Sequence, residues 1–146
     1  MERCFEKISL YDNGIIPTRA DDGSAGYDFY STITTVINPN EIIKIPTNIK
    51  CKMLDRDVLM LYVRSSIGIK RNLVLANGTG VIDSTYYNNP DTEGNIIIAL
   101  YNYGEEKQII KTGDRIAQGV IIPFLTVEND VVLSDKRTGG IGSSGN

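Results

Sequence analysis

The stretch IKIPTNIKCKM, residues 43–53, alternates apolar and polar side chains in the pattern of a half-buried β-strand. Its isoleucines, Cys51 and Met53 fall on odd positions, and its lysines fall on even ones. Four further short runs are rich in residues that favour strands, namely VLMLYV at 58–63, NIIIALYNY at 95–103, KQIIKT at 107–112 and RIAQGVII at 115–122. The chain therefore reads as a series of short strands.

Turn-forming residues separate these runs. They are Asn38-Pro39-Asn40, Asn77-Gly78, Asn88-Asn89-Pro90-Asp91 and Thr112-Gly113-Asp114. Residues 66–72 alone have the pattern of a helical turn or two. Many short strands at near-regular spacing predict an all-β fold, a jelly-roll-like barrel or sandwich. The sequence contains no internal repeat and no linker, so we expect one folded domain.

Size and charge exclude several classes of protein. A chain of 146 residues suits one domain with one core. A formal net charge of −3 makes a nucleic-acid-binding role improbable, because neutralising phosphates requires a concentrated basic face. No run approaches the ~20 apolar residues of a membrane span. The first residues, MERCFEKISLYDN, contain no segment of signal-peptide type, so the expected compartment is the cytoplasm.

The residues available for chemistry are restricted. The chain has no histidine, which excludes Ser-His-Asp and Cys-His nucleophilic schemes and histidine metal sites. Its two cysteines, Cys4 and Cys51, have no metal-ligand spacing and read as reduced structural residues. Catalysis must therefore use carboxylates, Lys, Arg, Tyr, hydroxyls or backbone groups.

The segment NGTGVIDSTY, residues 77–86, places one carboxylate, Asp83, directly after an apolar pair. A single acid between apolar neighbours suits a general base that is held in a defined position. The alternative is that Asp83 caps a turn, which is the commoner role of an aspartate near Gly and Ser.

Two further segments have residues suited to phosphate. Arg64-Ser65-Ser66 supplies a guanidinium and two hydroxyls, and the planar donors of arginine match two phosphate oxygens at once. Arg137 precedes a glycine-rich end, whose backbone can approach a ligand closely because no Cβ intervenes. Taken singly, the first also reads as a polar turn and the second as a disordered terminus.

Five segments in order resolve these alternatives: GSAGYDFY at 23–30, VRSSIGIK at 63–70, NGTGVIDSTY at 77–86, GDRIAQ at 113–118 and RTGGIGSSG at 137–145. They resemble the five ordered motifs of the homotrimeric dUTP pyrophosphatase family. The resemblance spans nearly the whole chain. It implies hydrolysis of dUTP to dUMP and pyrophosphate, which keeps uracil out of DNA and supplies dUMP for dTMP synthesis.

The resemblance also implies an assembly. We expect a jelly-roll homotrimer with three active sites at the junctions between subunits. One subunit would contribute the third motif, another the first, second and fourth, and a third its tail. Residues 1–136 would form the β domain, and residues 137–146 a flexible arm that closes over a site.

The family's roles transfer to matching positions in this chain. Asp83 is implied as the base that activates water for attack on the α-phosphate, and Tyr86 as the residue that packs on the deoxyribose. Asp28 would lie near a hydrated Mg²⁺ that bridges the phosphates. The implied uracil-side residues are Asn77, Gly80, Val81, Ile82 and Ile141. The implied triphosphate-binding residues are Arg64, Ser65, Ser66, Gln118, Arg137, Ser143 and Ser144.

The sequence departs from the family pattern at several points. The family commonly reads D-x-D-Y-[RQ]-G from the base onward, whereas here Thr85 replaces the second Asp, and Tyr87 and Asn88 follow. An insertion at residues 88–93 delays the glycine to Gly94, and we expect it to lengthen a hairpin at the rim of the site.

The arm departs as well. Ile141 stands where the family usually has a Phe that stacks on uracil. Isoleucine can cover the base by dispersion, but it lacks the stacking geometry of an aromatic ring.

Two other functions compete with this interpretation. The related dCTP deaminase family uses a Glu where Ala99 falls in this chain, and alanine cannot shuttle a proton. A non-catalytic nucleotide-binding protein would have no need of both Asp83 and the phosphate-binding residues. Measuring pyrophosphate release separates an enzyme from a binding protein.

Overall fold

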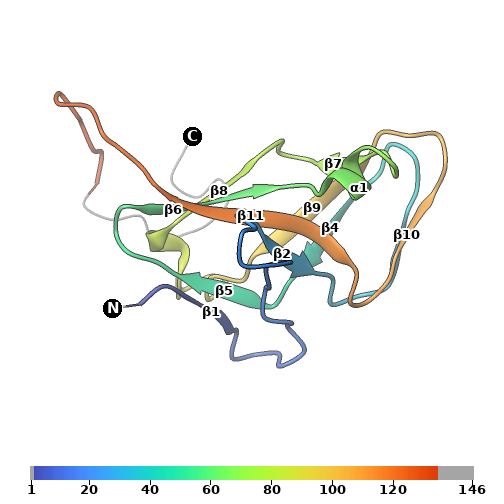
Figure 1. The fold of residues 1–146 in the computed structure, drawn as a ribbon, viewed down its shortest axis with the longest axis horizontal. Coiled ribbons are helices and arrows are strands. Elements are labelled where there is room, and N and C mark those ends of the chain that lie inside the picture. The colour runs from blue at the N-terminus through green and yellow to red at the C-terminus, as the bar shows by residue number, and fades with distance from the viewer. Residues whose placement is uncertain (1, 135–146) are drawn as a thin grey trace.

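Residues 2–134, which the computed structural model describes, form eleven strands and two helical turns (Figure 1). The strands are β1 (Cys4–Lys7), β2 (Tyr27–Tyr30), β3 (Thr35–Ile37), β4 (Ile42–Pro46), β5 (Ile49–Lys52), β6 (Asp57–Tyr62), β7 (Leu73–Leu75), β8 (Gly80–Asp83), β9 (Ile97–Asn102), β10 (Gln108–Ile110) and β11 (Arg115–Pro123). The helical turns are α1 (Ser65–Gly68) and the 3₁₀ turn η1 (Ser84–Tyr86). The predicted all-β, jelly-roll-like class is confirmed.

Long-range antiparallel pairing arranges these strands into sheets. A four-stranded sheet has the order β2-β11-β6-β8, and a three-stranded sheet has the order β4-β9-β7. Two further pairs, β1-β5 and β3-β10, complete the pairing among the named strands. Figure 1 shows β11, in orange, running along the middle of the molecule between β2 and β6. Strands that are distant in sequence therefore become neighbours.

The predicted turns are confirmed by backbone conformation. Asn40, Gly78, Asn88 and Gly113 all have positive φ, at 65°, 76°, 56° and 89°. Asn and Gly adopt this left-handed region with less steric cost than other residues, so each of the four predicted turns contains a residue suited to it.

Two local predictions need correction. The alternating run 43–53 divides into β4 and β5, because Asn48 has a φ of 57° and turns the chain toward a different partner strand. The helical turn is shorter and begins earlier than predicted, at Ser65–Gly68. The turn η1 was not predicted, since its sequence STY has no helical periodicity.

The core lies on one face of the four-stranded sheet. Pairing places Leu61 opposite Gly80 and Gly119, and all three face inward. The largest fully buried apolar side chains are Phe29, Ile37, Ile45, Ile49, Leu59, Leu73, Ile96, Ile98, Leu100, Ile110 and Ile116. Because side chains alternate along a strand, the residues of the four-stranded sheet that lie between its buried ones form its outer face.

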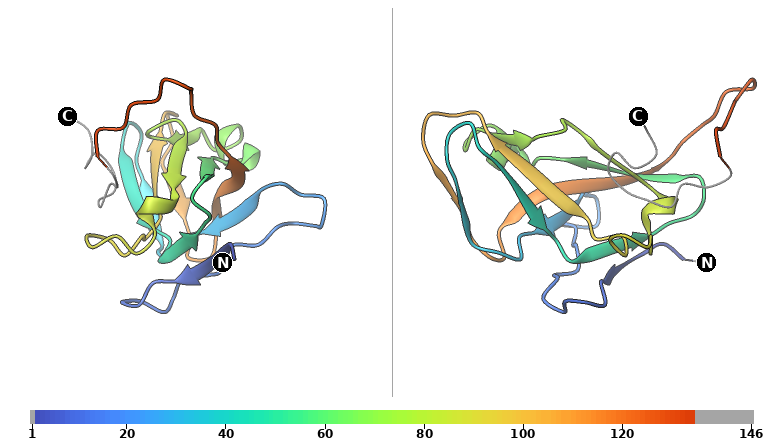
Figure 2. Two further views of the ribbon diagram at one scale, coloured as in Figure 1. Left: turned by 90° about the vertical axis from the view of Figure 1, so that its left-hand side faces the viewer. Right: turned by 180° about the vertical axis from the view of Figure 1, so that it is seen from behind.

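Residues 124–134 follow β11 and extend away from the body of the domain (Figures 1 and 2). Phe124 N still donates to Arg56 O at 2.9 Å, but beyond it the apolar side chains of Leu125 and Leu133 are 94% and 97% exposed. Within residues 2–134, no helix has the length and apolarity to cross a membrane.

Candidate active site

A cleft of about 440 Å³ lies where β2, β11 and the start of α1 meet. It contains residues from the first, second and fourth of the predicted motifs. The cleft is lined by Ala20, Ser24, Ala25, Gly26, Asp28, Arg64, Ser65, Ser66, Gln118 and Val120. The structure thus brings together Asp28 and four of the side chains that were predicted to hold the triphosphate.

Strand pairing explains how the cleft forms. Gln118 lies opposite Asp28 on β2 and opposite Tyr62 on β6, because β11 runs between these two strands. Arg64 follows two residues after Tyr62, at the point where the chain enters α1. The pairing of β2, β11 and β6 therefore brings together side chains that lie far apart in the sequence.

An ion pair orients the arginine of the cleft. Arg64 Nε lies 2.9 Å from Asp28 Oδ1, and Arg115 Nη1 lies 3.7 Å from Asp28 Oδ2. The Asp28 side chain is buried, whereas Arg64 and Arg115 are partly open to solvent. Burial strengthens a charge interaction because water screens it less. The pair engages Arg64 through Nε and so constrains the plane of its guanidinium.

Gly26 allows Gln118 to occupy its position in the cleft. A Cβ added at Gly26 would lie 2.7 Å from Gln118 Oε1, which is closer than real contacts allow. The Gln118 amide also lies 3.4 Å from Val63 O through Nε2. The second glycine of GSAGYD therefore leaves the space that the end of the Gln118 side chain occupies.

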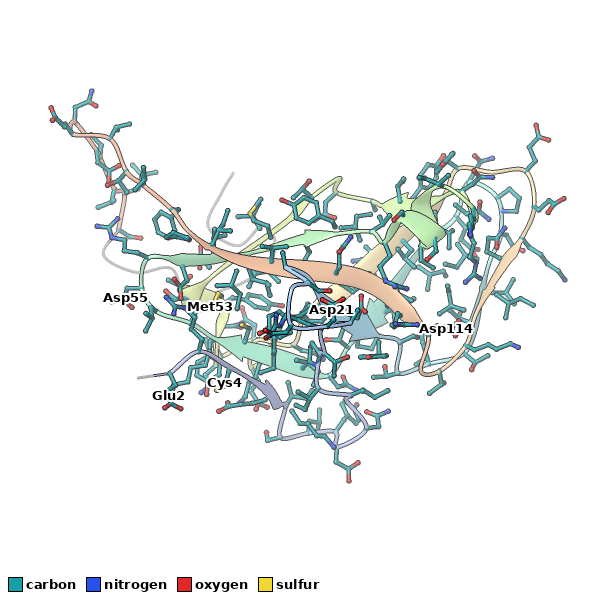
Figure 3. All side chains as sticks on the ribbon, viewed as in Figure 1. Glu2, Cys4, Asp21, Met53, Asp55 and Asp114 are labelled. Atoms are coloured by element: carbon teal, nitrogen blue, oxygen red, sulfur yellow. The ribbon has the colours of Figure 1, made fainter. Side chains whose placement is uncertain are left out.

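The loop before β2 is ordered by its own polar contacts. Asp21, labelled in Figure 3, accepts hydrogen bonds at Oδ1 from Gly23 N at 2.9 Å and from Ser24 Oγ at 3.1 Å. Arg19 Nη1 donates to Asp22 O at 2.6 Å and to Ser24 O at 3.1 Å. Ser24 lines the cleft but was not among the predicted site residues, although its place within GSAGYD was a signal for it.

Asp83 ends β8 and caps the turn that follows. Its Oδ1 accepts hydrogen bonds from Thr85 N at 3.0 Å and from Thr85 Oγ1 at 2.5 Å. The side chain is half-buried. The capping role that competed with the catalytic one is thus observed, and it holds the carboxylate in a defined orientation.

The predicted uracil-side residues lie along β8 and the turn before it. Asn77 is exposed in that turn, and Val81 is 63% exposed on the outer face of the sheet. Gly80 is buried, and a Cβ added there would lie 2.9 Å from Leu61 Cβ. Ile82 packs against the core. This segment therefore offers one apolar exposed side chain and accessible backbone in the preceding turn.

Tyr86 is more buried than expected for a residue whose role is to contact a sugar. It is 8% exposed, belongs to the core, and donates its hydroxyl to Asn95 O at 2.6 Å. Its ring therefore supports the turn after Asp83. The contact with deoxyribose stays a prediction.

One chain does not bring Asp83 and the residues predicted to bind phosphate together. Asp83 lies opposite Val58, whereas Gln118 lies opposite Tyr62, so they are four residues apart along β6. At a rise of about 3.3 Å per residue, this offset is about 13 Å along the strand. The two side chains nevertheless point to the same outer face of the sheet.

The insertion at 88–93 does not lengthen a hairpin, and that prediction was wrong. Residues 87–96 contain no strand and form a compact series of turns, in which Asn88 N donates to Glu93 O at 3.0 Å. Asn89 is buried and donates through Nδ2 to Tyr86 O at 2.7 Å. Side-chain hydrogen bonds within the loop replaced the cross-strand pairing that was expected.

This loop docks on the N-terminal segment. Lys50 Nζ lies 2.7 Å from Glu93 Oε2, which also accepts from Ser9 N at 2.9 Å. The Lys50 ammonium and the Ser9 donors lower the pKa of Glu93 to about 2. Tyr87 donates to Glu6 Oε1 at 2.5 Å, and that hydrogen bond raises the pKa of Tyr87 to about 12.

The residues of the cleft fit Mg²⁺ as an ion carried by the substrate. Asp28 is the single carboxylate among its lining residues, and within residues 2–134 no group of three or more His, Cys, Asp or Glu side chains could hold a metal. Mg²⁺ usually retains several waters and binds through one or two carboxylates together with substrate phosphates. One carboxylate is compatible with that mode of binding.

The remaining predicted residues lie outside the described part of the chain. They are Arg137, Ile141, Ser143 and Ser144, together with the arm 137–146 and its boundary with the β domain. These assignments stay predictions.

An all-β jelly-roll-like domain whose cleft is lined by Arg64, Ser65, Ser66 and Gln118, with the Asp83 carboxylate on the same sheet face, has side chains suited to contacting a phosphorylated substrate. Residues 12–145 match the family model described as dUTPase. The chain therefore belongs to the dUTPase family, and its enzymatic class is dUTP diphosphatase.

Individual relatives match this chain over most of their length. A deoxyuridine 5'-triphosphate nucleotidohydrolase of Lactococcus lactis is 45% identical over 146 residues, which cover 98% of this chain and 97% of the relative. The crystal structure of dUTPase from Streptococcus mutans superposes with a TM-score of 0.81 at 39% identity, covering 86% of this chain and 99% of that one.

A phage enzyme shares the fold at lower identity. A Staphylococcus bacteriophage 80alpha dUTPase variant with dUpNHpp superposes with a TM-score of 0.75 at 26% identity, covering 91% of this chain and 97% of that chain. Family membership favours dUTP hydrolysis over deamination of dCTP, in agreement with Ala99 at the deaminase's acid/base position.

Proposed function

We propose that this chain hydrolyses dUTP to dUMP and pyrophosphate by attack of water on the α-phosphate, with Asp83 as the general base. The observation that carries this proposal is the orientation of Asp83, whose Oδ1 is held by two donors from Thr85. A general base must be fixed within hydrogen-bond reach of the proton it removes.

The cleft supports a role in binding the triphosphate. Arg64 would hold phosphate oxygens with its guanidinium, and Ser65 and Ser66 would donate hydroxyl hydrogen bonds. Gln118 would donate through its amide from the opposite wall. Asp28 keeps Arg64 in place and would accept from water around Mg²⁺. Mg²⁺, when bound with the substrate, neutralises charge that develops on the phosphates.

The arm would complete the binding site. Arg137, Ser143 and Ser144 are proposed to bind phosphate, and Ile141 to cover the uracil ring. Val81 and the backbone of residues 77–82 would contact the base from the other side. Product dUMP would then serve thymidylate synthesis, and removal of dUTP would limit incorporation of uracil into DNA.

The functional unit is proposed to be a homotrimer with shared sites. Asp83 and Gln118 of one chain are offset by about 13 Å along β6 and lie on strands that are separated by β6. Both reach the outer sheet face, which also exposes the apolar side chains Tyr62, Val81 and Ile122. A second copy on this face would cover apolar surface and place its Asp83 near the cleft of the first chain.

Sedimentation tests the proposed trimer and should give a mass near three times the 16.1 kDa of one chain. A catalytically active monomer would contradict the proposal of shared sites.

The central test replaces the base. Asp83→Asn should retain dUpNHpp binding but lose about 10²–10⁴-fold in kcat, because an amide cannot accept the proton of water. Asp55→Asn, an exposed aspartate labelled in Figure 3, is the matched control and should keep full activity. Pyrophosphate release should be measured in parallel with dUTP, UTP, dCTP and dTTP. Near-wild-type kcat in Asp83→Asn would remove Asp83 from this role.

A further inference from the structure

Thr85 contacts Asp83 through two separate donors. Its backbone N lies 3.0 Å from Asp83 Oδ1, and its hydroxyl Oγ1 lies 2.5 Å from the same oxygen. The backbone contact is available to any residue except proline. The hydroxyl contact requires Thr or Ser at this position, since these side chains alone are short enough and carry an O–H donor.

The side chain at position 85 therefore decides whether Asp83 receives this second hydrogen bond. An ionised Asp at this position could accept hydrogen bonds but could not donate one. In this chain the position supplies a donor to the carboxylate proposed as the base. A hydrogen bond to a charged group contributes more than one between neutral groups.

The surrounding turn holds the Thr85 hydroxyl in place. The next residue, Tyr86, is anchored in the core and donates to Asn95 O at 2.6 Å. On the other side, β8 pairs with β6, which places Asp83 opposite Val58. The turn is thus fixed at both ends, and its geometry directs the hydroxyl to Asp83.

We infer that Thr85 is a positioning residue for Asp83, whose hydroxyl fixes the carboxylate orientation needed for deprotonating the attacking water. This inference rests on the proposed role of Asp83 as general base. Thr85 does not contact the reacting atoms; it acts through Oδ1 of Asp83. Misplacing a reactive group by about 1 Å can cost on the order of 10²-fold in rate, so fixing one oxygen is sufficient to affect turnover.

The test compares four variants with the wild-type enzyme in dUTP turnover. Thr85→Val keeps the shape of the side chain but removes the donor, and we expect kcat to fall about 10- to 100-fold. Thr85→Ser restores the donor and should keep kcat within about threefold. Ser84→Ala is the control from the same turn, because the Ser84 side chain makes no hydrogen bond within residues 2–134; it should leave kcat unchanged.

The readouts distinguish positioning from a structural role. KM for dUTP, dUpNHpp affinity and the urea midpoint should stay close to wild type in Thr85→Val, since the substrate contacts and the core are intact. Thr85→Ala serves as a second variant without the donor. Wild-type kcat in Thr85→Val, or an equal loss in Thr85→Ser, would overturn the inference.

The Asp83 test keeps the two proposals separable. If Asp83→Asn loses turnover while Thr85→Val retains it, Asp83 keeps its proposed role as base and Thr85 has no positioning role. If Asp83→Asn retains turnover, both fall, because Thr85 then has no base to position.

Discussion

Gly26→Ala should impair catalysis without destabilising the fold. The added Cβ would lie 2.7 Å from Gln118 Oε1 and 3.4 Å from Gln118 Cβ, so the amide at the end of the glutamine must swing away. This is inexpensive for the fold, because the displaced atom is the end of a flexible side chain. Gly26 is not among the described glycines with positive φ, so alanine adds no strain of that kind.

The size of the effect follows from the contact that is lost. Gln118 is proposed to donate to a phosphate, and a hydrogen bond to a charged group contributes about 1.5–3 kcal/mol. Every 1.4 kcal/mol is about tenfold, so kcat/KM for dUTP should fall roughly 10- to 150-fold. The thermal midpoint should stay the same or rise slightly, because alanine reduces the conformational freedom of the unfolded chain.

The assay is steady-state pyrophosphate release, with Gly23→Ala as the matched control. A Cβ at Gly23 meets Asp21 Oδ1 at 3.5 Å, an ordinary contact, so this variant of the same loop should be fully active. In a Gln118→Ala background, Gly26→Ala should cost nothing further, since both changes remove one interaction. If Gly26→Ala stays within threefold of wild type, or its effect simply adds to that of Gln118→Ala, the proposed steric link is wrong.

Four further changes test other parts of the structure. The Asn102 side chain is fully buried and makes three hydrogen bonds with backbone groups, two of which its amide nitrogen donates. In Asn102→Asp this donating nitrogen becomes an accepting oxygen, so the free energy of unfolding measured in urea should fall by about 3–5 kcal/mol. Since the folded pKa of Glu93 is about 2 against 4.5 ordinarily, its contribution is present above pH 4.5 and lost as pH falls toward 2. The stability difference between wild type and Lys50→Met should accordingly shrink between pH 5 and pH 3, and a constant difference would contradict this. Tyr86→Ala should narrow the preference for dUTP over UTP, with Tyr86→Phe as the control that keeps the ring; unchanged discrimination would mean that the sugar is read elsewhere. Deleting residues 137–146 should leave a folded trimer that binds dUTP but hydrolyses it poorly, because the segment proposed to close over the site is lost; full turnover would show that this segment has no catalytic role.

The sequence was a good guide wherever the determining interactions are local. The alternation in residues 43–53 predicted strands, because side chains of a strand point alternately to its two faces. Asn40, Gly78 and Gly113 were predicted in turns, since left-handed backbone is available to few residue types. The motif resemblance identified the family without reference to any long-range contact.

Local patterns failed where hydrogen bonds cross between segments. The loop at 88–93 was expected to extend a hairpin, but Asn89 and Glu93 satisfy its backbone and dock it on Ser9 and Lys50. Nothing in the run NNPDTE indicates these partners, because they lie far away in the sequence.

The sequence by itself determined that this is an all-β dUTPase and which residue types it has for binding phosphate and accepting a proton. The tertiary structure alone decided that β11 lies between β2 and β6, which places Gln118 beside Asp28 and Arg64 in one cleft. It also decided that Asp83 lies at the other end of β6. The physical reason is that strand order and register result from burying one face of each strand against distant partners, and no local pattern specifies which partners those are.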